Sequence, residues 1–160
     1  MGRKQGESHR EYKARMIDTV SDSFCGAKWY NATIWLGHGG TTSCHHPPAH
    51  QIDLEDIKEN PSAIHNSRHK KKMRKMMQKG TRPKECEYCW KIEDTGARSD
   101  RVYRSGEYWA QESKEDILDA GAGGNINPRY VEVNFNQACN FKCSYCSPHL
   151  SNSWEKEIKE

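Results

Sequence analysis

The clearest strand pattern lies between residues 27 and 46. The stretch AKWYNATIWL is rich in aromatic and β-branched residues that alternate with smaller ones, which predicts a strand. GHGG at residues 37–40 is a turn signal, and TTSCHH predicts a returning strand. Such a hairpin would bring Cys25 and Cys44 to the same end.

A helical pattern follows the hairpin. Ser67 is suited to an N-cap, and Gly80 is well placed to end the helix. Met73, Met76 and Met77 are spaced so that they share one helix face, which predicts that the helix docks on the hairpin through methionines. The knuckle CEYC, with Cys86 and Cys89, comes shortly after this helix.

The remaining segments have weaker patterns. Residues 1–21 read as a charged N-terminal tail, in which REYKARMIDTV could form a short helix but fraying is expected, and residues 96–128 as a linker with a short helix at 112–119. RYVEVNFN, residues 129–136, alternates in the manner of a strand. SNSWEKEIKE predicts the first turns of a helix capped by Ser151 or Ser153.

Composition changes this picture in one respect. Only 34% of the 160 residues are hydrophobic and 29% are charged, so a large apolar core is not expected and another interaction must stabilise parts of the chain. The net charge of +3 indicates no particular partner.

No run has the length and apolarity of a membrane helix, and the N-terminus lacks the apolar segment of a signal peptide. We therefore expect a cytoplasmic protein without a membrane partner.

Seven cysteines in such a chain favour metal binding over disulfides. They form a group of four and a group of three, separated by a long cysteine-free segment: Cys25, Cys44, Cys86 and Cys89, then Cys139, Cys143 and Cys146. The second group has the spacing C-x3-C-x2-C. A structural zinc would need a fourth ligand, which His149 or a carboxylate could supply. Alternatively, three thiolates can hold three irons of a 4Fe-4S cluster and leave the fourth iron open to a substrate or cofactor.

The stretch NQACNFKCSYCSPHLSNSWEKE, which follows a predicted strand, resembles the cluster motif of the radical S-adenosylmethionine (radical SAM) enzymes. The resemblance includes Asn140, Phe141 and the aromatic residue before the last cysteine. It implies that Cys139, Cys143 and Cys146 bind a 4Fe-4S cluster, that its open iron binds SAM, and that Tyr145 lies near the adenine. It also implies reductive cleavage of SAM to a 5′-deoxyadenosyl radical, which abstracts hydrogen from a substrate.

The first group alone suits either a zinc ribbon or an iron–sulfur cluster. Its setting resembles the twitch domain, the shortened form of the SPASM auxiliary-cluster domain, with Arg74 as the helix arginine and Glu93 after the knuckle. The resemblance implies that Cys25, Cys44, Cys86 and Cys89 hold a second 4Fe-4S cluster, either redox-active or structural. The order departs from the family, because twitch domains usually follow the barrel. His45 and His46 could substitute as ligands, although a polar role near the turn fits them better.

These features predict an α+β fold. A small hairpin-plus-helix cluster-binding domain, residues 22–95, would precede the linker 96–128 and the first βα unit of an incomplete radical SAM (β/α) barrel, residues 129–160. We expect this to be the N-terminal portion of a longer enzyme, inactive by itself and with no catalytic side chain to name. The resemblance implies an electron donor such as flavodoxin or ferredoxin, and peptide or protein modification as the reaction.

A zinc-stapled binding module is the alternative. The basic stretch from Arg68 to Lys84 contains no acidic residue, so it could contact nucleic acid through phosphates. A solvated helix face explains the same residues more simply, so a nucleic-acid partner is not expected. An electron-transfer ferredoxin is excluded by the ligand count, since three cysteines leave one iron without a protein ligand.

Overall fold

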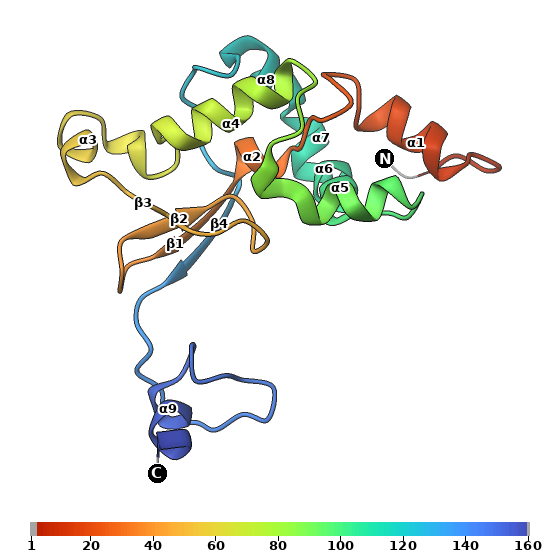
Figure 1. Ribbon diagram of the computed structural model, residues 1–160. Helices are drawn as coiled ribbons and strands as arrows, with labels where there is room; N and C mark the ends of the chain where they lie inside the picture. The colour runs from red at the N-terminus through yellow and green to blue at the C-terminus, as the bar shows by residue number, and fades with distance from the viewer. Residues whose placement is uncertain (1–2, 160) are drawn as a thin grey trace.

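The structure, a computed structural model, describes residues 3–159 and has an α+β fold (Figure 1). A mixed sheet carries four strands in the order β3-β2-β1-β4. The α+β class expected from the sequence is confirmed. The strands are β1 Asn31–Trp35, β2 Gly40–Thr42, β3 His50–Gln51 and β4 Tyr130–Asn134.

Helices account for most of the other regular structure. In the described part of the chain, none of them is both long enough and apolar enough to cross a membrane. The α-helices are α1 His9–Met16, α2 Ala27–Tyr30, α3 Leu54–Glu59, α4 Arg68–Gln78, α5 Glu87–Asp94, α6 Asp100–Gly106, α7 Tyr108–Glu112, α8 Lys114–Ala120 and α9 Asn152–Lys159, and the 3-10 helices are η1 Pro61–Ile64 and η2 Lys84–Cys86.

The predicted hairpin forms, but its first strand is shorter than expected. β1 pairs with β2 in antiparallel fashion, with Thr33 opposite Thr42 and Trp35 opposite Gly40. Residues 27–30, expected to be strand, form the single helical turn α2 instead. This turn buries all four of its side chains, whereas a strand would direct alternate side chains to opposite faces.

β4 pairs in parallel with β1, from Asn31 opposite Tyr130 to Trp35 opposite Asn134. The strand expected at residues 129–136 is thus confirmed. Cys25 precedes β1 and Cys139 follows β4, so the two cysteine groups lie at opposite ends of this parallel pair. Four residue steps at about 3.3 Å each make the paired segment roughly 13 Å long. In Figure 1, α9 and the loop before it lie beyond the end of β4, away from the other helices.

α4 begins and ends where the sequence predicts. The Ser67 side chain accepts a hydrogen bond from the Lys70 backbone N–H, and Gly80 has a φ of 74°, in the left-handed region that ends helices. Met73 and Met77 are buried, and Met77 belongs to the main core. The methionine face therefore does pack inward through Met73 and Met77, but chiefly against α2, while Met76 is only partly buried.

Two segments contain more structure than the sequence pattern suggests. The N-terminal tail forms α1, which has a complete capping box between Ser8 and Glu11. Met16 and Ile17, at its end, pack against Val102 of α6. The region 96–128, expected as a linker with one short helix, folds into α6, α7 and α8.

The main core is small and largely aromatic. Phe24, Trp29, Tyr30 and Trp90 are buried together, and the Phe24 and Trp29 ring centroids lie 5.1 Å apart. Cys25 and Cys86 belong to the same cluster. Two members of the four-cysteine group are therefore part of the core itself.

Arg74 is fully buried and joins α4 to this core. Its Nε donates to the carbonyl of Lys28 (2.8 Å) and its Nη1 to Asn66 Oδ1 (2.7 Å). The guanidinium also lies 5.9 Å from the centre of the Trp29 ring. One buried cation thus satisfies acceptors from the segment that precedes β1 and from the loop that precedes α4.

We predict that Arg74→Met lowers the free energy of unfolding by about 2–4 kcal/mol, because two buried acceptors lose a charged donor. Arg74→Lys should recover only part of the loss, since an ammonium cannot reproduce the forked geometry. Urea denaturation of the protein measures both. Arg82→Met is the control, because Arg82 is half-exposed in its pair with Asp94 and should change stability by less than about 0.5 kcal/mol. Equal losses at the two positions would refute the role of Arg74.

Candidate metal centre

The four cysteines of the first group line a single pocket, which we call the four-cysteine pocket: Cys25, Cys44, Cys86 and Cys89. They come from three segments. Cys25 precedes α2, Cys44 follows β2, and the other two lie at the start of α5, with Cys86 at its N-cap. The expectation that the hairpin brings Cys25 and Cys44 to one end is confirmed.

Burial raises the pKa of three of these thiols, those of Cys44, Cys86 and Cys89. Desolvation raises the pKa of Cys44 to about 11 and that of Cys86 to about 12. Burial also raises the pKa of Cys89, and hydrogen bonds from the Arg101 backbone N–H and the Ser99 side chain oppose that rise. The His46 backbone N–H likewise donates to Cys44. The pocket therefore already directs donors at two of its sulfurs.

Lys28 carries a buried positive charge beside the pocket. The residue is only 3% exposed, and its Nζ pairs with Glu85 Oε1. Burial opposes the charged form, but Cys86 and Glu85 outweigh it and raise the pKa of Lys28. The other oxygen of Glu85 lies 2.6 Å from His69 Nε2, which reaches solvent. Lys28 therefore stays charged, and Glu85, itself fixed by His69, holds the ammonium group in position.

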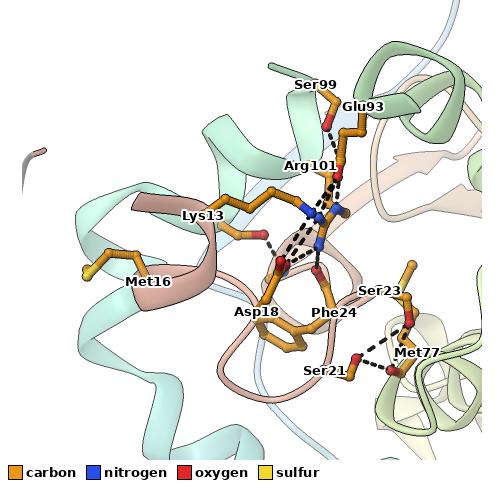
Figure 2. Close-up of polar contacts among 12 residues, drawn as sticks. Lys13, Met16, Asp18, Ser21, Ser23, Phe24, Met77, Glu93, Ser99 and Arg101 are labelled. Carbon is orange, nitrogen blue, oxygen red and sulfur yellow. Dashed lines mark hydrogen bonds and ion pairs between the residues drawn. The ribbon is translucent and has the colours of Figure 1, made fainter. Parts of the chain in front are cut away.

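Arg101 of α6 supplies a second buried cation (Figure 2). Its Nε and Nη2 donate to the two oxygens of Glu93, at 2.7 and 2.6 Å, and its Nη1 lies 3.3 Å from Asp18 Oδ1. Nη1 also donates to the carbonyl of Phe24, the residue before Cys25. Lys13 of α1 completes the network, 3.1 Å from each of the two carboxylates. Arg101 thereby ties α1, α5 and α6 to the pocket.

His46 and Asp100 lie at the edge of the pocket. His46 Nε2 is 2.5 Å from Asp100 Oδ2, and the His46 ring stacks on Tyr88 with centroids 3.9 Å apart. Within the described residues, His45, His46 and Asp100 form a group of three possible ligands whose donor atoms all lie within 4.8 Å of one another. The pocket cysteines are not gathered this closely.

Cys139, Cys143 and Cys146 lie together on the loop between β4 and α9, which we call the cysteine loop. The Phe141 N–H approaches Cys139 Sγ at 3.4 Å, and the Cys146 N–H donates to the Cys143 carbonyl at 2.9 Å. All three thiols are partly accessible to solvent. A single short loop therefore presents three sulfurs at the surface.

The start of α9 anchors the cysteine loop. Asn152 Oδ1 accepts from the Cys139 N–H at 3.1 Å, and Trp154 Nε1 donates to the Cys143 carbonyl at 3.1 Å. The Ser153 hydroxyl donates to the Cys139 carbonyl. The helix expected at this position is thus present, and its first turn sets the path of the loop.

Two other predicted site residues lie nearby. Tyr145 is 90% exposed, and a hydrogen bond with Cys143 raises its pKa. His149, the possible fourth zinc ligand, contacts the loop through its backbone carbonyl, which accepts from Gln137 Nε2 at 2.7 Å. The ring of Tyr145 is therefore free to contact a ligand bound beside the loop.

The chain matches none of the protein-family models, curated proteins or solved structures with which it was compared. The geometry of the two cysteine groups must therefore carry the functional argument.

The sequence pattern brings out the cysteines but not the cations around them. Lys28 lies within the aromatic stretch AKWY, and a lysine in such a stretch is the one sequence signal that its charge is buried. Asp100 and Arg101 lie in a region expected to be a linker, and no local pattern distinguishes them from surface residues. Their roles depend on contacts with segments far away in sequence.

We predict that metal binding at the four-cysteine pocket releases protons, because thiols with a raised pKa must ionise to become ligands. The apparent affinity for Zn²⁺, used as a probe, should rise by more than about tenfold per pH unit between pH 6 and 8. Calorimetry of the metal-free protein in buffers of different ionisation enthalpy measures the protons released.

A protein with Cys139, Cys143 and Cys146 replaced by Ala isolates the pocket in this experiment. Cys86→Ser in that background is the matched control and should abolish the tight, proton-coupled phase. Affinity that is independent of pH would contradict the prediction.

Proposed function

We propose that this chain is an iron–sulfur protein of the radical SAM type, in which the cysteine loop holds a 4Fe-4S cluster through three thiolates. When bound, such a cluster supplies the electron that cleaves the sulfonium of SAM and yields a 5′-deoxyadenosyl radical. The observation that carries the proposal is a set of three thiols on one anchored loop at the carboxyl end of a parallel strand. The set is one ligand short of a closed site, which leaves an iron for SAM.

The residues of the cysteine loop have defined tasks in this proposal. Cys139, Cys143 and Cys146 are the iron ligands, and the N–H of Phe141 stabilises the charge on the first sulfur. Trp154 and Asn152 keep the loop on the start of α9. Tyr145, exposed beside Cys143, would stack on the adenine of SAM.

The edge strand β4 is consistent with an incomplete barrel. It pairs with β1 on one side and lies at the edge of the described sheet, with Val131 and Phe135 exposed. Further barrel strands would pair along this edge, cover these apolar side chains and complete the SAM site. Substrate binding would then depend on those strands, and a flavodoxin or ferredoxin would supply electrons. Modification of a peptide is the reaction class that the twitch resemblance favours.

The four-cysteine pocket would hold the second, closed 4Fe-4S cluster. A tetrahedral zinc with Zn–S bonds of about 2.3 Å needs sulfurs about 3.8 Å apart. The four sulfurs are spread more widely than the 4.8 Å grouping that His45, His46 and Asp100 satisfy within the described chain. The all-thiol donor set suits iron–sulfur chemistry, and the resemblance to the twitch domain favours a cluster over a single zinc ion.

A zinc-stapled binding module is the second candidate function, favoured by one observation. Lys72, Lys75 and Lys79 project from the exposed side of α4, opposite its buried methionines. Such a face could bind phosphates of a nucleic acid. It predicts a colourless protein with roughly two zinc ions per chain.

We predict that protein purified and reconstituted without oxygen is brown and contains on the order of eight irons and eight sulfides per chain. Cys143→Ala should remove about half of the iron and abolish the change that SAM causes in the EPR spectrum of the reduced protein. Cys86→Ala should also remove about half but keep that change. These paired variants are each other's controls. A colourless product holding zinc in place of iron would sink the proposal.

A further inference from the structure

The four-cysteine pocket is lined by three cations and by one carboxylate, that of Asp100, which is half-exposed and contacts His46. The cations are Lys28, Arg101 and Arg104. Lys28 is paired with Glu85 and Arg104 with Glu107, whereas Arg101 binds both Glu93 and Asp18. None of these four carboxylates is among the residues that line the pocket in the described chain. Glu93 and Asp18 neutralise the charge of Arg101, so Lys28 is the cation that bears most on the sulfurs, and Glu85 acts on Cys86 in the opposite sense.

Two of these cations are strongly buried, so their charges are weakly screened. Lys28 is 3% exposed and Arg101 is 2% exposed. A charge a few ångströms from a neighbour interacts far more strongly in such surroundings than at a hydrated surface. Arg104 is partly exposed and contributes less.

Lys28 lines the pocket and is the cation whose charge interacts with two of its cysteines, Cys86 and Cys44. Its own partner, Glu85, is further fixed by His69, so the ammonium group cannot swing away without breaking that chain of contacts. The contacts with Glu85 thus hold the ammonium group of Lys28 in the lining of the pocket.

Four thiolates around a cluster of four irons leave the centre with a net negative charge, and reduction by one electron makes it more negative. Fixed positive charge nearby stabilises the reduced form and raises the reduction potential. In this step one iron passes from ferric to ferrous, an external reductant supplies the electron, and no bond to the protein is made or broken.

We propose that the buried charge of Lys28 raises the reduction potential of the four-cysteine centre and makes it a redox-active electron acceptor. This inference rests on the proposed function, because it requires that the pocket hold an iron–sulfur cluster. Lys28 acts on the cluster through its charge and does not bind an iron. The pocket is thereby distinguished from a purely structural centre.

The test is a potentiometric titration of the reconstituted full chain, followed by EPR, with Cys139, Cys143 and Cys146 replaced by Ala so that the pocket alone contributes. Lys28→Met should lower the equilibrium constant for reduction by at least tenfold, which is 59 mV or more toward negative potential for one electron. Lys28→Arg should keep the potential near that of the parent. Glu85→Gln should move it in the opposite direction, because the carboxylate no longer offsets the charge of Lys28.

The control is Lys91→Met, on the same helix as Cys89 but exposed in its pair with Glu87. It should leave the potential unchanged. Opposite shifts in Lys28→Met and Glu85→Gln are the signature of a charge effect, which a loss of packing does not produce. If Lys28→Met fails to assemble a centre, Glu85→Gln decides the question, since it retains the lysine.

The two proposals fail in different ways. A parent protein without iron overturns the proposed function and this inference with it. A parent that contains the iron–sulfur centre, but whose potential is unmoved by Glu85→Gln and Lys28→Met, overturns the role of Lys28 alone.

Discussion

Burial of cysteine thiols against a small aromatic core is the constraint on which the rest of the structure depends. Cys25 and Cys86 pack with Phe24, Trp29 and Trp90, so the core and the candidate centre are one region. A chain with so few apolar residues gains little from burial alone. Folding brings the thiols together, and a bound metal ion stabilises their ionised form. Folding and metal binding therefore depend on each other.

Buried arginines around that core connect segments that are far apart in the sequence. Arg74 binds neutral acceptors from two segments, whereas Arg101 binds the carboxylates of Asp18 and Glu93 and a carbonyl beside the first cysteine. Each arginine donates through several nitrogens in one plane, so it fixes the relative positions of elements far apart in sequence. Together with Lys28, Arg101 also sets the electrostatic environment of the pocket.

The parallel pairing of β1 with β4 joins the two cysteine groups. One group precedes β1 and the other follows β4, so a single pair of strands sets the separation between them. The cysteine loop is held in turn by the first turn of α9. The strand pair therefore places the two candidate centres at opposite ends of the sheet, with the cysteine loop joined to β4 by an irregular connector (Figure 1).

The sequence by itself determined the features that depend on neighbouring residues: the hairpin turn, the caps of α4 at Ser67 and Gly80, the strand before the cysteine loop, and both cysteine spacings. These follow from local backbone preferences and short-range hydrogen bonds. Only the tertiary structure decided that residues 27–30 turn into a helix, that the N-terminal tail and residues 96–128 pack as helices, and that Lys28 and Arg101 face the thiols. Those outcomes depend on which distant segments share the core, and no local pattern of hydrophobic and polar residues encodes that choice.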